Sequence, residues 1–167
     1  MFKEFKKELL LAAVLTAGLF TLMDLLGDFL VPETGAATLS AGLMAFSIVI
    51  LILPALVACI PSGYLIAKKT SDIKAAIFVP ALGAAIGSLV LMVLSAGSLL
   101  LMTDAAWQEQ MAKFAVYGGE IFAAMSLAEY KAMIVFSVIF GAVFLAILNF
   151  AIGLAGGFVG SKLAKKK

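Results

Sequence analysis

Long apolar stretches separated by short polar segments dominate the pattern along the chain. Four stretches are each long enough to cross a ~30 Å hydrocarbon core as a helix. They occupy residues 9–31, 39–67, 75–102 and 127–163. Ser126 and Glu129 have the spacing of a capping box, so we expect the last helix to begin there. The pattern predicts an all-α integral membrane four-helix bundle, with residues 1–167 forming a single transmembrane domain.

The polar segment between the third and fourth stretches, residues 103–126, has a periodicity of its own. Trp107, Met111 and Phe114 stand at i, i+4 and i+7, which is one stripe on a helix. Asp104 is a candidate N-cap for that helix. We expect an amphipathic helical outer loop lying on the membrane interface. A lid over the bundle and a docking surface for a partner are the alternatives.

Composition agrees with the membrane class and narrows the chemistry. The chain is 64% hydrophobic and 13% charged, against about 45–50% and 25% in soluble domains. It has no histidine, and all twelve basic residues are lysine, so a histidine base and bidentate arginine contacts are missing. Cys59 is the only cysteine. We therefore predict a protein that is not an enzyme, with no catalytic residue, cofactor, metal site or nucleic-acid partner.

Lysine placement predicts the orientation. Ten of the twelve lysines lie in three clusters: before the first stretch, between the second and third, and at the end of the chain. Four spans bring all three clusters to one side, which the positive-inside rule places in the cytoplasm. The prediction is a multi-pass cell-membrane protein with both termini cytoplasmic.

Small residues recur at four-residue spacing within the apolar stretches. In lipid, helices associate through close backbone contact, which small residues allow. Three GxxxG pairs and one ladder of small residues supply the candidate helix-packing positions, which are Gly63, Gly83, Gly87, Gly153, Gly156, Gly157 and Gly160. The same motif serves intramolecular packing and a homodimer seam, and both remain open.

The helix ends carry a resemblance. The segments GYLIAKK and GGFVGSKLAKKK close two small-residue stretches, and ALGAAIG opens the hairpin between them. In these segments the chain resembles a group of small archaeal and bacterial four-span membrane proteins of unknown function. The resemblance implies the four-span topology and carries over no functional residue, and the polar outer segment departs from it.

A few polar residues and prolines interrupt the apolar stretches. Asp24 and Asp28 share one helix face near the end of the first stretch, and Asn149 lies near mid-depth. These three form a candidate polar or ion site, because polar groups within a membrane are costly and commonly functional. For Asn149 a hydrogen bond to another helix is the favoured interpretation, through Ser47, Ser95 or a carbonyl freed by a proline. Pro54 and Pro61 are expected to kink the second helix, each removing a helical hydrogen bond.

Two functions fit this pattern. The first is a non-enzymatic scaffold, assembly factor or accessory subunit of a membrane complex, with the lipid bilayer and a membrane protein as partners. The alternative is a small homo-oligomeric transporter or channel for a cation or small solute. It would use Asp24, Asp28, Asn149 and the two prolines.

Overall fold

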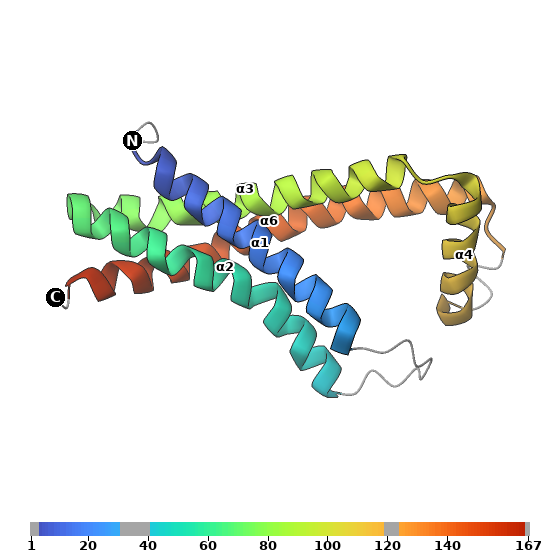
Figure 1. The fold of residues 1–167 in the computed structure, drawn as a ribbon, viewed down its shortest axis with the longest axis horizontal. Coiled ribbons are helices and arrows are strands. Elements are labelled where there is room, and N and C mark those ends of the chain that lie inside the picture. Colours follow the sequence, from blue (N-terminus) through green and yellow to red (C-terminus); the bar gives the residue numbers. More distant parts are fainter. Residues whose placement is uncertain (1–3, 31–40, 119–123, 166–167) are drawn as a thin grey trace. The chain divides into compact units, whose positions relative to one another are not determined.

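The computed structural model describes residues 4–30, 41–118 and 124–165, with side chains described outside 23–30, 41–51 and 113–118. These residues form five helices and their connecting turns, with no strand among them (Figure 1). The helices are α1 (Lys6–Leu30), α2 (Ala41–Thr70), α3 (Ile73–Leu100), α4 (Asp104–Gly118) and α6 (Leu127–Lys165). The prediction of an all-α protein is confirmed.

Three segments within these helices are long and apolar enough to cross a membrane. They are Ile52–Thr70 of α2 and the whole of α3 and α6. Their apolar character follows from a predominance of leucine, isoleucine, valine, alanine, phenylalanine and glycine, with only scattered polar residues between the helix ends. The protein is therefore associated with a membrane through apolar helices, as the pattern of apolar stretches predicted.

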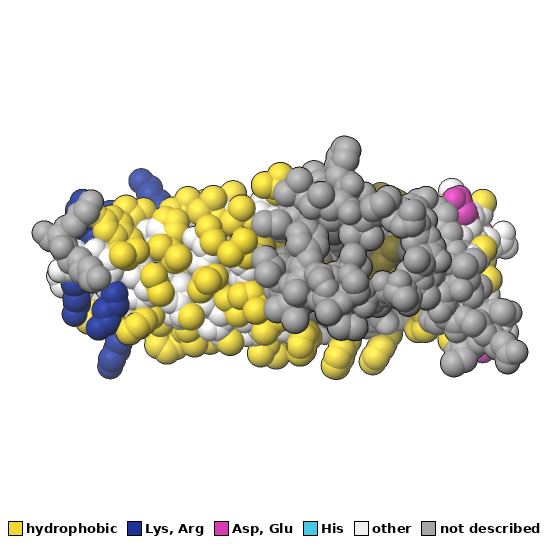
Figure 2. All heavy atoms as spheres, turned by 90° about the horizontal axis from the view of Figure 1, so that it is seen from below, with side chains coloured by type: hydrophobic (Ala, Val, Ile, Leu, Met, Phe, Trp, Pro, Cys, Tyr) yellow, Lys and Arg dark blue, Asp and Glu magenta, His cyan; other side chains and the backbone are white. Residues whose placement is uncertain are grey.

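The chain divides into two compact units. Unit 1 comprises residues 1–90 and 144–167, which hold α1, α2, the first part of α3 and the last part of α6. Unit 2 comprises residues 91–143, which hold the end of α3, α4 and the start of α6. Figure 2 shows lysine side chains gathered at one end of a mostly hydrophobic surface.

Side chains rather than backbone alone define the turn from α2 to α3. Ser71 adopts a left-handed conformation with φ 57°, which reverses the chain after α2. The Asp72 carboxylate accepts a hydrogen bond of 3.1 Å from the Ala75 N–H and so caps α3. The Asp72 N–H in turn donates to the Thr70 hydroxyl at 3.2 Å.

The two helix starts in unit 2 are also capped. The predicted capping box is confirmed: the Ser126 N–H donates to the Glu129 carboxylate at 2.8 Å, and the Glu129 N–H donates to the Ser126 hydroxyl at 3.3 Å. The prediction of Asp104 as N-cap is wrong. The Thr103 hydroxyl accepts the Ala106 N–H at 3.3 Å, which makes Thr103 the cap and Asp104 the first helical residue.

Candidate functional site

Unit 1 is assembled through glycines that lie against the main chain of neighbouring helices. A Cβ atom on Gly157 of α6 would lie 2.7 Å from the Ala76 carbonyl oxygen of α3. A Cβ atom on Gly63 of α2 would lie 2.7 Å from the Gly157 carbonyl oxygen and 2.9 Å from that of Ala76. Only glycine permits such an approach. We call Gly63, Ala76 and Gly157 the three-helix junction.

The Ala76 carbonyl at this junction has no helical hydrogen-bond donor, because the residue four positions later is a proline. Pro80 has no N–H, so the Ala76 oxygen four residues earlier lacks its helical donor. That oxygen faces the Cα atoms of Gly63 and Gly157, where weak C–H···O contacts are available to it. The Pro80 oxygen itself accepts a hydrogen bond from the Cys59 thiol at 3.3 Å. Pro54 and Pro61, the prolines singled out from the sequence, both lie inside α2.

The other predicted helix-packing glycines lie in similar surroundings. A Cβ atom on Gly83 would lie 2.6 Å from the Leu9 oxygen of α1, and one on Gly87 would meet the Ala13 oxygen. On α6, the glycines and the residues whose main chain they face are Gly153 with Ala81, Gly156 with Leu56, and Gly160 with Ile60 and Tyr64. All seven glycines thus contact another helix of the same chain.

Asn149 lies in the core of unit 1, fully buried. Its Nδ2 atom donates to the Ser88 hydroxyl at 2.6 Å, and that hydroxyl donates to the Ala84 oxygen at 2.9 Å. The partner is therefore Ser88 and not Ser95, whose hydroxyl is exposed and donates to a carbonyl of its own helix at 3.1 Å. Ser47, the other expected partner, lies outside the residues whose side chains are described.

Three polar atoms in unit 1 are buried without a hydrogen-bond partner among the described residues. They are Thr16 Oγ1 on α1, Ser62 Oγ on α2 and Asn149 Oδ1 on α6. Each side chain is fully buried. A buried acceptor left without a donor costs about 1–3 kcal/mol. Sequence reasoning missed Thr16 and Ser62, because a lone hydroxyl in an apolar helix commonly bonds its own backbone, as that of Thr21 does to Ala17.

Asp24 and Asp28 both belong to the last part of α1. Their side chains lie outside the described residues, so the ion site they would share with Asn149 stays a prediction. Lys131, a lysine outside the three clusters, donates to Asp104 at 2.5 Å within unit 2.

A buried carboxylate stands at the lysine-rich end of unit 1. Glu8 of α1 is only 4% exposed and accepts a hydrogen bond from the Lys69 ammonium of α2. This hydrogen bond holds the pKa of Glu8 below its usual value, against the opposing effect of burial. The two residues are 61 positions apart, and no local pattern indicates the pairing.

Trp107, the first residue of the predicted interfacial stripe, packs within unit 2. Only 4% of it is exposed, and its ring meets that of Tyr130 on α6 edge-on, with centroids 6.1 Å apart. The Lys131 ammonium lies 6.0 Å from the indole centroid. Met111 is partly buried, and the Phe114 side chain lies outside the description. The start of α4 is thereby attached to α6.

The helices of unit 2 leave much of their apolar surface open. Phe136 and Phe140 are 70% and 66% exposed, and their rings stack with centroids 6.4 Å apart. At Gly97 of α3 and Gly141 of α6, the position that a Cβ would take has no atom within 4 Å apart from the adjacent residues and the local backbone of the same helix. These two glycines of unit 2 therefore lie beside open space.

No protein-family model matches the chain, and no curated protein or solved structure is similar enough to count as a match. Within the described residues, no group of three histidine, cysteine or acidic side chains could hold a metal ion.

Proposed function

We propose that the protein is a non-enzymatic integral membrane protein that serves as a scaffold, assembly factor or accessory subunit of a membrane complex. In this proposal the chain spans the membrane four times, with both termini in the cytoplasm. The three lysine clusters and the length of α1, 25 residues, support this topology. The resemblance to small four-span membrane proteins is consistent with it.

The proposal rests on the contrast between glycines that contact another helix of this chain and glycines that lie beside open space. On α6, the glycines that belong to unit 1 contact neighbouring helices, whereas Gly141 in unit 2 remains uncovered, as does Gly97 on α3. A glycine beside open space lets the backbone of another membrane helix approach closely. The exposed rings of Phe136 and Phe140 stand on the same helix as Gly141 and offer large side chains for packing. The occupant we propose is a transmembrane helix of another membrane protein.

Site-specific crosslinking in native membranes tests this. A photoreactive residue in place of Phe140 should form one adduct of constant mass with another membrane protein, and the pair should co-purify at fixed stoichiometry. The same probe in place of Val14, which is 60% exposed on α1 in unit 1, should form no such adduct.

A leucine substitution supplies the matched control. Gly141→Leu should abolish the adduct because its side chain fills the open space. Gly18→Leu should leave it intact, since Gly18 also has nothing within 4 Å but lies in unit 1. Equal adducts at positions 14 and 140, or equal effects of the two leucines, would contradict the proposal. An adduct with a second copy of the chain would favour the homo-oligomeric alternative.

That alternative is a small homo-oligomeric transporter or channel for a cation or small solute. The buried oxygens of Asn149 and Thr16 favour it, because each is without a hydrogen-bond partner among the described residues and can accept from a solute or coordinate a cation. Ion flux into proteoliposomes should then fall on Asn149→Leu and on Asp24→Asn, while Ser95→Ala, at an exposed serine, leaves it unchanged. Absence of flux under cation and proton gradients would count against transport.

A further inference from the structure

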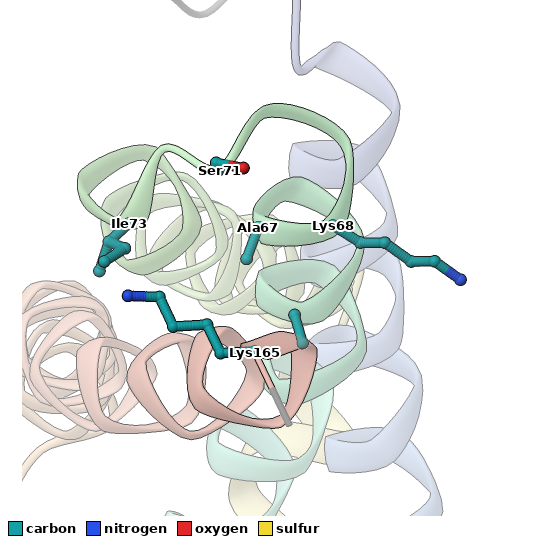
Figure 3. A pocket seen from close by; sticks show the side chains of 6 residues that line it. Ala67, Lys68, Ser71, Ile73 and Lys165 are labelled. Atoms are coloured by element: carbon teal, nitrogen blue, oxygen red, sulfur yellow. The ribbon is translucent and has the colours of Figure 1, made fainter. Parts of the chain in front are cut away.

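A pocket of about 250 Å³ opens at the lysine-rich end of unit 1. It lies where the end of α2, the turn into α3 and the last turn of α6 come together (Figure 3). Six residues line it: Ala67, Lys68, Ser71, Ile73, Ala164 and Lys165. The lining thus combines small or apolar residues with two lysines and one hydroxyl.

The charge at the pocket is positive. Lys165 extends across the opening toward Ile73, whereas Lys68 points away on the far side of α2 (Figure 3). Among the described residues, the ion pairs are Lys69 with Glu8 and Lys131 with Asp104, so neither lining lysine is neutralised by one. The nearest acidic group along the chain, Asp72, directs a carboxylate oxygen to the backbone of α3.

The lysines also have a structural role. They stand in the last turns of α2 and α6, where positive charge offsets the negative end of the helix dipole. Lys162 and Lys165 of α6 serve that role equally, since both stand in its last turn. They differ in their relation to the pocket. Lys165 lines it, whereas the Lys162 ammonium lies over the Phe158 ring, 5.2 Å from its centroid.

We propose that this pocket binds the phosphate of an anionic glycerophospholipid headgroup. Lys165 would pair with the phosphate, and the small side chains of Ala67 and Ala164 leave room for the glycerol. Ile73 lines the pocket and is 37% exposed, so its apolar side chain would contact the acyl chains. Acyl contacts favour a lipid over a free phosphate. The inference does not depend on the proposed scaffold function.

Native mass spectrometry of the full chain in detergent tests the site. Titration with phosphatidylglycerol should give one tightly bound lipid per chain, and phosphatidylcholine of the same acyl composition should bind more weakly. Lys165→Gln should weaken the phosphatidylglycerol equilibrium about five-fold, as expected for one lysine near an anionic headgroup. Lys162→Gln, the matched control, should change it less than two-fold. Thermal unfolding of both variants checks that they fold.

The competing outcomes are distinct. Equal weakening by the two glutamine substitutions would overturn the proposal, because it would show attraction to the general charge of this end. Equal binding of the two lipids would overturn it as well. If inorganic phosphate or glycerol 3-phosphate competes at the same concentration as phosphatidylglycerol, the site takes free phosphates and the lipid assignment is wrong.

Discussion

The glycines of α6 have opposite surroundings in the two units of this protein. In unit 1, a Cβ on Gly157 would lie 2.7 Å from a carbonyl of α3, whereas in unit 2 Gly141 of the same helix has nothing within 4 Å. Unit 2 instead joins α4 to α6 through Trp107, Tyr130 and the Lys131–Asp104 ion pair. One helix therefore takes part in two kinds of packing, close backbone contact at one end and side-chain contact at the other.

The chain carries one natural reporter for each kind of packing. Cys59 is its only cysteine and is fully buried in unit 1. Trp107 is its only tryptophan and is buried in unit 2. Maleimide labelling of the thiol and fluorescence of the indole therefore follow the two units separately in the same sample.

The largest effect is expected from filling the three-helix junction. Gly157→Leu should prevent α2, α3 and α6 from closing, because overpacking of a tight core costs about 1–3 kcal/mol or more and here the obstacle is main chain. Cys59 should become readily labelled in mild detergent. Gly141→Leu should leave labelling at the wild-type rate. Slow labelling of both variants would show that close packing at Gly157 does not contribute to the stability of unit 1.

Removal of the aromatic contact in unit 2 comes next. Tyr130→Ala should cost about 3 kcal/mol locally, the range for deleting a large buried side chain, and should shift Trp107 emission to longer wavelength. Labelling of Cys59 should not change. A variant that exposes the cysteine as strongly as the tryptophan would show that the two units unfold together.

The buried polar contact in unit 1 should matter less. Ser88→Ala removes the acceptor of the Asn149 amide, and hydrogen bonds between membrane helices contribute about 1 kcal/mol. Unfolding in a graded series of denaturing detergent should register that loss. The control is Ser95→Ala, which removes an exposed hydroxyl bonded within its own helix and should change stability by under about 0.5 kcal/mol. Equal losses of stability in the two variants would show that the hydrogen bond between Asn149 and Ser88 does not stabilise the fold.

The smallest expected effect concerns the pairing of Glu8 with Lys69. The pKa of Glu8 is lowered in the folded protein, so its contribution is present above the unfolded value of about 4.3 and disappears as pH falls through the folded value. Because Lys69 is largely exposed, Glu8→Gln should cost only about 0.5 kcal/mol at neutral pH. The difference from wild type should vanish in acid. Glu4→Gln, at an exposed site, should show no such pH-dependent difference.

Local features were predictable, and contacts between helices were not. Apolar run length located the helices, and the capping box at Ser126 follows from spacing alone. The partner of Asn149 depends on how two nearly uniform apolar helices rotate about their axes, and no polar face reports that rotation. The pairing of Glu8 with Lys69 is similarly non-local. Thr103 and Asp104 are adjacent and both are good capping residues, so the sequence does not show which of them precedes the first helical residue.

The arrangement of unit 1 has a consequence for biosynthesis. Its first part ends at residue 90, and the segment that completes it, residues 144–167, is translated after all of unit 2. The grooves on α2 and α3 that receive Gly153–Gly160 therefore stay vacant while more than fifty residues pass through the ribosome and the insertion machinery. A nascent chain stalled within unit 2 offers those grooves to any neighbouring helix, so timely completion of translation protects this protein from mispairing.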